Sequence, residues 1–360
     1  MPINVLAAAT ALLTSLMLTP AAIRLALHFG VVDSPGPRKV HLAPVPLWGG
    51  LAMYGGTILA VALFTGELDP AARLQIAAIG VGASLLVLVG SLDDGGVLHH
   101  QIKLLVAMPL ATLILIAAGI HATVFSGIFG AGLVWAAADI GLTLLWVVGV
   151  TAAFSILDHM DGLCAGVASL AAAVFLFYAV SAGQVLVGIL AAAVLGASLG
   201  FLRWNFNPAR IFMGDGGAMF LGFMMATLGL KLRVAGMPDL HAAAIPVFIL
   251  AVPIFDTTLV TISRSRRHLV PFTSPGKDHT SHRLSNLGLG HKRAVLVLWA
   301  AGAVSGGVGV MLGRVSTTTG LWIVAVAGAI AAMAIVALER CRFERQEARV
   351  GPALASDGRR

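Results

Sequence analysis

The sequence predicts an all-α protein that crosses a membrane many times. Of its 360 residues, 58% are hydrophobic and only 11% are charged, whereas soluble domains carry about a quarter charged residues. Apolar runs of about 20 residues, long enough to cross a hydrocarbon core as a helix, recur along nearly the whole chain. We therefore expect one transmembrane domain over residues 1–340 and a short, basic, disordered cytoplasmic tail over residues 341–360.

The apolar runs divide the chain into eleven expected spans. In chain order they cover residues 4–29, 46–64, 71–91, 102–121, 139–154, 163–181, 185–202, 218–230, 241–263, 293–312 and 321–338. Residues 123–138 are expected to form a re-entrant or interfacial segment, or a plain loop. The first run lacks a basic n-region and a small-residue cleavage site, so we expect a retained span rather than a cleaved signal peptide.

The basic residues predict which ends of these spans face the cytoplasm. Nineteen Lys and Arg residues lie after the odd-numbered spans, against four on the other side. Since basic residues mark the cytoplasmic side, the N-terminus is expected outside and the C-terminus inside. This topology and contact with anionic head groups explain the net charge of +7 better than nucleic acid does. Cys164 and Cys341 are too few and too far apart for a metal cluster or a disulfide framework.

Eight Asp residues are expected at this same cytoplasmic face. They are Asp33, Asp93, Asp94, Asp158, Asp161, Asp215, Asp256 and Asp278. Topology does not explain them, because carboxylates contribute little to orientation. Their gathering at one membrane surface indicates a functional site.

Asp93 and Asp94 end the third expected span, where the helix dipole disfavours negative charge by a few tenths of a kcal/mol or more. A Mg²⁺ site beside a phosphate would explain the pair, and so would a solvated helix end paired with Lys103. Between the fifth and sixth spans, Asp161 is placed to cap the next helix. Asp158 lies close to an apolar run, where an unpaired charge is costly.

The stretch over residues 205–217 is the most informative. Pro208 is expected to interrupt the helix. The glycines that follow let backbone N–H groups approach a ligand at the start of the next helix, where anions bind. A carboxylate at Asp215 fits such an anion site if a divalent cation bridges it to phosphate. Taken alone, a Gly-Asp-Gly-Gly turn more often has only a structural role.

Two further segments carry charge at the same face. Asp256 lies about 10 Å inside the ninth expected span, where a carboxylate indicates a functional site or a pair with one of the arginines that follow, Arg264, Arg266 and Arg267. The turn that contains Lys39 is basic and proline-rich. It is explained by topology alone or by contact with a lipid head group or a nucleotide.

The loop after the ninth span carries His279, His282 and Arg283, which would share one face of a helix. His and Arg beside basic neighbours suit phosphate. Structural capping and a metal site are the alternatives. Zinc is disfavoured because no third ligand such as Cys or Glu stands nearby in the sequence.

Taken in order, these segments resemble the polyprenyl-phosphate N-acetylhexosamine-1-phosphate transferase family over about residues 33–290. The motifs that carry the resemblance are Asp93-Asp94 with Lys103 downstream, Asp158-x-x-Asp161-Gly162-Leu163, Asn205-x-x-Pro208-Ala209-x-x-Phe212-Met213-Gly214-Asp215 and Asp278-His279-x-x-His282-Arg283-Leu284. The last motif and the Arg38-Lys39-x-His41 turn are closer to the enzymes that move GlcNAc 1-phosphate than to phospho-MurNAc-pentapeptide transferase, which is the alternative.

The resemblance implies transfer of a sugar 1-phosphate, expected to be GlcNAc 1-phosphate, from a UDP-sugar to undecaprenyl or another polyprenyl phosphate, with release of UMP. It implies Mg²⁺, or Mn²⁺, as the cofactor. It also implies a multi-pass enzyme of the bacterial plasma membrane that starts cell-envelope glycans such as lipopolysaccharide or teichoic acid, and it is compatible with a homodimer. We expect direct attack by the lipid phosphate, with Asp93 or Asp94 as base, rather than a covalent aspartyl intermediate.

The resemblance further implies roles for single residues. The catalytic residues are expected to be Asp93, Asp94, Asp215, His279 and His282, with the same three aspartates as metal ligands. The substrate-binding residues are expected to be Lys39, Lys103, Asp158, Asp161, Asn205, Phe212, Asp256 and Arg283. Among these, Phe212 would stack on uracil, Asn205 and Asp158 would contact the nucleotide, and the two histidines would lie at the pyrophosphate.

The chain departs from the family pattern at a few positions. Ala152 and Ser155 stand where members commonly have Asn, His159 replaces the first Gly of Asp-Gly-x-Asp-Gly, and Ala218 replaces a frequent Ser. Ser281 stands where the frequent His-x-His-His motif has its second His. The metal and phosphate residues are retained, so the departures concern the sugar and the base.

Two hypotheses from other functional classes compete with the transferase hypothesis. An ion-coupled transporter would place its acids near the bilayer midplane, often with inverted repeats, whereas the acids here gather at one face and no repeat is evident in the sequence. A catalytically inactive relative that only binds polyprenyl phosphate is the other alternative, because the missing Asn residues permit it.

Overall fold

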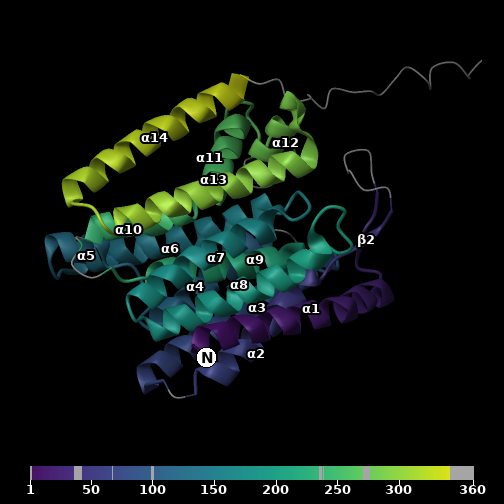
Figure 1. Cartoon of the computed structure of the whole chain (residues 1–360), viewed down its shortest axis with the longest axis horizontal. Coiled ribbons are helices and arrows are strands. Elements are labelled where there is room, and N and C mark those ends of the chain that lie inside the picture. Colours follow the sequence, from purple (N-terminus) through teal and green to yellow (C-terminus); the bar gives the residue numbers. More distant parts are fainter. Residues whose placement is uncertain are drawn as a thin grey trace, which may run out of the picture.

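The computed structural model describes residues 2–35, 43–66, 68–98, 101–234, 237, 239–270 and 276–340. Most of this part of the chain is helical, and the long helices pack side by side into one bundle (Figure 1). The expected multi-pass, all-α class is therefore confirmed. The tail over residues 341–360 and the turn with Lys39 lie outside the described residues.

Each of the eleven expected spans falls on helix. The elements concerned are α1 (Ile3–Phe29), α2 (Gly49–Phe64), α3 (Pro70–Asp94), η1 (Lys103–Ala107) continued by α4 (Met108–Ala117), α6 (Leu133–Leu157), α7 (Leu163–Ser181), α8 (Val185–Asn205), α9 (Gly214–Lys231), α10 (Asp239–Ile249) with α11 (Ala251–Ser265), α13 (Gly290–Leu312) and α14 (Thr317–Arg340). Among the described residues, seven helices are long and apolar enough to cross a membrane, or eight if one bent pair is a single span. The number of crossings stays a prediction.

The bent pair corrects the ninth expected span. Instead of one continuous helix, α10 and α11 meet at an angle of 82°. Pro253 lacks the N–H that would donate to the carbonyl of Ile249, so the helical hydrogen-bond pattern is interrupted beside Leu250. The bend directs α11 toward the segment that carries the histidines.

Helix α9 forms the centre of the bundle, and almost all of its side chains are buried. Its first turn packs against two other helices through glycines. A Cβ at Gly50 of α2 would collide with Gly217, and a Cβ at Gly90 of α3 would collide with Gly216. Small residues allow such close approach of helix backbones. The start of α9 is thereby held against the end of α3.

Short elements complete one end of the bundle. Strands β1 (Val32–Asp33) and β2 (Val45–Pro46) pair antiparallel, with Val32 opposite Pro46. The carbonyl of Pro46 accepts a 2.9 Å hydrogen bond from the N–H of Phe212, which ties this hairpin to the start of α9. Helix α12 (Thr280–Leu284) and segment η2 (Ser285–Leu289) lead into α13 at the same end, and helix α5 (Val124–Phe129) precedes α6.

Candidate active site

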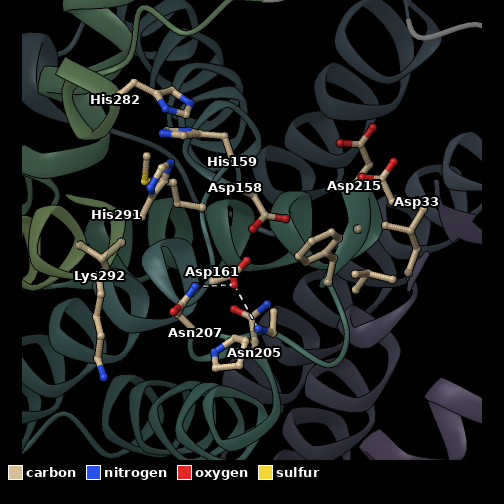
Figure 2. A pocket seen from close by; sticks show the side chains of 18 of the residues that line it. Asp33, Asp158, His159, Asp161, Asn205, Asn207, Asp215, His282, His291 and Lys292 are labelled. Carbon is tan, nitrogen blue, oxygen red and sulfur yellow. Dashed lines mark hydrogen bonds between the residues drawn. The ribbon is translucent and has the colours of Figure 1, made fainter. Parts of the chain in front are cut away.

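A cavity of about 600 Å³ opens where α3, α6 and α8 end and where α9 and α13 begin (Figure 2). Seven predicted site residues line it, namely Asp94, Asp158, Asp161, Asn205, Phe212, Asp215 and His282. Asp93, Lys103, Asp256, His279 and Arg283 are not among the lining residues. Segments as far apart in the sequence as Asp33 and Val295 therefore meet at one site, as the ordered motifs predicted.

The end of α3 and the start of α9 bring three carboxylates together. Oδ1 of Asp94 accepts a 2.9 Å hydrogen bond from the backbone N–H of Asp215. The ammonium of Lys103 donates to Oδ2 of Asp93 at 2.9 Å and, through a short hydrogen bond, to Oδ2 of Asp215. The expected pair between Lys103 and Asp93 is therefore present, and the same ammonium also neutralises part of the charge of Asp215.

This acidic group fits a divalent cation. Oδ2 of Asp94 is buried and has no hydrogen-bond partner among the described residues, and a buried carboxylate oxygen left unpaired is costly. Gly214 has a φ of +72°, and a Cβ there would collide with the carboxylate of Asp94. Glycine thus leaves the room that this carboxylate needs. Carboxylate oxygens are the ligands that Mg²⁺ prefers.

The loop between α6 and α7 adds two further carboxylates. Burial, together with the charges of Asp215 and Asp94, raises the pKa of Asp158 to about 8. The predicted capping of α7 by Asp161 is wrong, because the N-cap residue is Gly162, which has no side chain to cap the helix. Asp161 instead accepts hydrogen bonds of 3.0 Å from Nδ2 of Asn207 and from the backbone N–H of Ala209.

Asn205 and Phe212 lie at the two ends of the non-helical segment between α8 and α9. Oδ1 of Asn205 accepts from the N–H of Gly162, and its Nδ2 donates to the carbonyl of Ile211, both at 3.0 Å. Asn205 therefore fixes the Asp158 loop to the segment before α9. Phe212 lines the cavity, so its ring is in a position to contact a bound base.

Asp256 pairs with a histidine and not with the arginines suggested by the sequence. Its carboxylate lies 2.9 Å from Nδ1 of His279 and accepts a 2.7 Å hydrogen bond from the N–H of Thr280. Only about 1% of Asp256 is exposed. The alternative pairing with the arginines is not formed, because the bend before α11 turns this carboxylate toward α12.

Arg264 of α11 and Arg267, which follows this helix, bind a different carboxylate. Arg264 donates two 3.0 Å hydrogen bonds to Asp278, and Arg267 donates a short one. Burial opposes ionisation of Asp278, but the hydrogen bonds and charge of Arg264 outweigh it and lower the pKa of this carboxyl group. These contacts hold the loop that precedes α12.

Arg283 lies in the protein interior. It donates to Oγ of Ser263 at 2.8 Å and to Oε1 of Glu339 in α14 at 2.6 Å, and about 1% of it is exposed. Of the predicted group of His279, His282 and Arg283, the two histidines do lie together, with ring centroids 6.0 Å apart, whereas Arg283 is directed elsewhere. Only His282 of the three lines the cavity.

Several lining residues were missing from the predicted site. They are His159, Asn207, Lys277, His291, Lys292 and the discussed but unassigned Asp33. Figure 2 shows His159, His282, His291 and Lys292 on the opposite side of the cavity from Asp215 and Asp33. The basic run between residues 264 and 293 was visible in the sequence. The packing of α13 onto α7 is needed to show that His291 and Lys292 of this basic run reach the cavity.

Comparisons with known proteins agree with this arrangement. The family model described as Glycosyl transferase family 4 matches residues 76–233. A probable undecaprenyl-phosphate N-acetylglucosaminyl 1-phosphate transferase of Bacillus subtilis (strain 168) is 38% identical, over 83% of this chain and 82% of the relative. The decaprenyl-phosphate N-acetylglucosaminephosphotransferase of Mycolicibacterium smegmatis is 32% identical over 76% and 73%. An undecaprenyl-phosphate alpha-N-acetylglucosaminyl 1-phosphate transferase of Salmonella typhi is 28% identical over 80% and 78%.

Proposed function

Because this chain belongs to glycosyl transferase family 4, we propose that the cavity is the active site at which GlcNAc 1-phosphate passes from UDP-GlcNAc to a polyprenyl phosphate. The resemblance read from the ordered motifs is confirmed by the relatives, including its GlcNAc branch. The chain is an enzyme that transfers GlcNAc 1-phosphate onto polyprenyl phosphate. The UDP donor and the UMP product belong to the proposal.

One observation carries the proposal, which is that a single cavity has an acidic side and a basic side. Asp94 and Asp215 line the first, and Lys277 and Lys292, together with the imidazoles of His282 and His291, line the second. A donor diphosphate needs cationic donors along its oxygens. A lipid phosphate that attacks it must be held beside it, although both are anions. Charges of both signs in one cavity meet these two requirements.

Asp94 and Asp215 would hold Mg²⁺, with Asp93 next to them. When bound, the ion neutralises phosphate charge and orients the reacting groups. Lys103 already lies between Asp93 and Asp215, so its ammonium limits the repulsion within the acidic group. Phosphoryl transfer depends mainly on this kind of positioning and charge compensation.

In the proposed reaction, an oxygen of the lipid phosphate attacks the sugar-bearing phosphorus of the donor. The bond from that phosphorus to the bridging oxygen breaks, and UMP leaves with the electron pair. A phosphate monoester has its second pKa at about 6, so most of the lipid phosphate is dianionic at neutral pH. A base is needed only for the protonated fraction, and Asp94 suits that role better than Asp93, which is paired with Lys103.

Lys and Arg residues gather at one end of the expected spans, and basic residues mark the cytoplasmic side. This distribution supports a cavity that opens to the cytoplasm in a bacterial plasma membrane. A UDP-sugar is a cytoplasmic metabolite class, and a polyprenyl phosphate is confined to the bilayer. The cavity lies at the ends of apolar helices, where both can reach it.

A panel of UDP-sugars tests the proposal. Purified wild-type protein is incubated with undecaprenyl phosphate, Mg²⁺ and each labelled donor in turn, and the lipid product is separated by thin-layer chromatography. We expect a labelled lipid with UDP-GlcNAc that disappears when either the lipid or Mg²⁺ is omitted. Absence of lipid product with every donor would overturn the proposal.

A further inference from the structure

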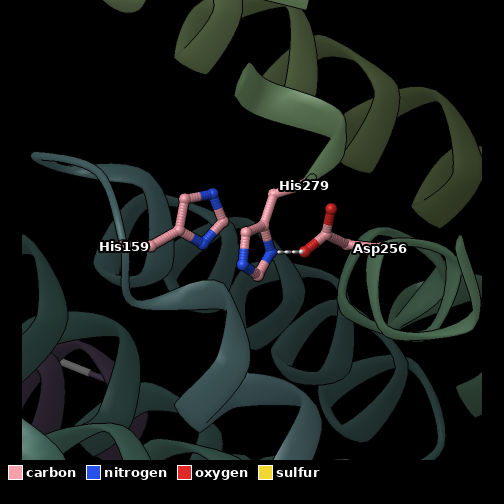
Figure 3. Close-up of side chains that lie close together, drawn as sticks. All are labelled: His159, Asp256 and His279. Atoms are coloured by element: carbon pink, nitrogen blue, oxygen red, sulfur yellow. Dashed lines mark hydrogen bonds and ion pairs between the residues drawn. The ribbon is translucent and has the colours of Figure 1, made fainter. Parts of the chain in front are cut away.

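Three imidazoles meet beside the cavity, and one of them comes from an unexpected segment. His159 lies on the loop between α6 and α7, whereas His279 and His282 belong to α12 and the residue before it. The rings of His159 and His279 stack, with centroids 3.9 Å apart and planes inclined by 27°. Figure 3 shows the two rings side by side, with Asp256 on the far side of His279. His279 is therefore held from both sides.

Hydrogen bonds fix the ring of His159. Its Nδ1 lies 2.9 Å from the carbonyl of Ile156, and its Nε2 lies 2.5 Å from Oγ of Ser281. The carbonyl accepts only, so Nδ1 carries the proton, and Nε2 accepts from the serine hydroxyl. This neutral form agrees with the effect of burial, which lowers the pKa of His159 well below its usual range.

A metal site is the other use that these groups suggest, because donor atoms of His159, Asp256 and His279 lie within 4.8 Å of one another. Both ring nitrogens of His159 are already engaged by Ile156 and Ser281. A metal ligand needs one nitrogen lone pair directed at the ion. The hydrogen bonds thus favour a packed, hydrogen-bonded cluster over a metal centre.

The two partners of the Nε2 contact are both departures from the family pattern. By the resemblance stated in the sequence analysis, His159 stands where the related motif commonly has Gly, and Ser281 stands where it frequently has His. Ser281 is fully buried, and its hydroxyl touches the ring of His159. An imidazole at position 281 would need the space that His159 fills, so the chain has room for a ring from only one of the two positions.

We propose that His159 is a positioning residue for the transfer reaction and that it occupies, from the α6–α7 loop, the place of an imidazole at position 281. Its ring stacks on His279 and holds the residue before α12, and thereby His282, at the cavity. The inference rests on the proposed transferase activity, because it assigns these histidines to the pyrophosphate end of the donor.

Four proteins test the exchange: the wild type, His159→Gly, Ser281→His and the double variant. We expect each single change to lower the turnover with UDP-GlcNAc about tenfold to hundredfold, because small displacements of positioned groups are that costly. The KM for UDP-GlcNAc should change little. The double variant should recover at least about tenfold over the poorer single variant, since contacting residues couple by such amounts.

Two controls separate positioning from general loss of structure. Ser265→His adds an imidazole at an exposed serine and should not rescue His159→Gly. His159→Phe keeps a ring that can stack on His279 but removes both hydrogen bonds that fix it, so we expect a modest fall in melting temperature and a large fall in turnover. If the glycine variants do not fold, this variant decides, and a wild-type rate in it would overturn the proposal.

Other outcomes are equally decisive. A double variant no better than the product of the two single effects would overturn the exchange. Binding of one Zn²⁺ per wild-type chain, with loss of this binding in His159→Gly, would also overturn the proposal. It would show that the three side chains form a metal site. If the wild type itself does not transfer GlcNAc 1-phosphate, the proposed function fails separately. The melting temperatures of the same four proteins then test the exchange, which predicts a double variant more stable than either single variant.

Discussion

The backbone N–H of Asp215 donates a 2.9 Å hydrogen bond to the carboxylate of Asp94, across 121 residues of sequence. This contact joins the end of α3 to the first turn of α9. The N-terminal end of a helix favours an anion through its unpaired N–H groups and its dipole. The anion is here a side chain of the protein itself, which places two carboxylates at one edge of the cavity.

Asp215→Asn should lower turnover at least about a hundredfold, because an amide keeps the volume but removes the charge that would hold Mg²⁺, a contribution of several kcal/mol. The loss should persist at saturating Mg²⁺. Asp69→Asn is the matched control, since this exposed residue caps the other end of α3 through the N–H of Ala72 and Asn caps about as well as Asp. Wild-type activity in the Asp215 variant would remove Asp215 from the metal site.

Asp93→Asn and Asp94→Asn should both lower turnover, but they should differ in their effect on stability. Both should lower turnover about a hundredfold or more if they act on the metal or the lipid phosphate. The Asp94 variant should keep its melting temperature, because the amide oxygen still accepts from the N–H of Asp215. The Asp93 variant loses a partly exposed ion pair with Lys103, worth about 1 kcal/mol or less. Full turnover with lowered melting temperatures in both would make the pair structural.

Gly214→Ala should disturb the site more than the fold. The residue has a φ of +72°, and its new Cβ would displace the carboxylate of Asp94. Gly119→Ala is a close control, because Gly119 has a φ of +75° and nothing lies within 4 Å of the position that a Cβ would take there. Both changes incur the left-handed backbone cost of about 1–2 kcal/mol. Only the Gly214 variant should lose turnover, and equal losses in the two would contradict the role of this contact.

Asp278→Asn should lower stability in a pH-dependent way. Arg264 would be left buried without its counter-charge, which costs about 3 kcal/mol. The folded pKa of Asp278 is lowered, so its contribution is present above the unfolded value of about 3.9 and is lost as the pH falls through the folded value. The difference in melting temperature between variant and wild type should be constant near pH 7 and shrink at acid pH. A difference that grows on acidification would contradict the ion pair.

Much of this architecture could be predicted because apolar runs and breaks leave strong local signals. The end of α3 at Asp94 and the limits of α7 agree with the sequence pattern, since a charged pair and a Gly-rich loop end apolar helices. The acidic side of the cavity could be predicted, because its Asp residues lie at or near helix ends that the expected topology places at one face of the membrane. The bend at Leu250 was missed because prolines also occur inside continuous membrane helices.

The basic side of the cavity was harder to predict, because its geometry depends on contacts between distant segments. The sequence offers Asp256 either a functional site or a pair with one of the arginines that follow it, but packing directs it to His279. His159 was read as a departure that affects the sugar. Its contact with Ser281 is a side-chain interaction across 122 residues, for which a single sequence holds no local signal.

Transfer of the donor's β-phosphate is the most direct test of the central claim. UDP-GlcNAc labelled with ³²P at either the α or the β phosphate is incubated with purified wild-type protein, undecaprenyl phosphate and Mg²⁺, and the lipid and water-soluble fractions are counted separately. We expect the β label to move into the lipid and the α label to stay in water as UMP. Recovery of both labels in water as UDP, or transfer of neither, would contradict it.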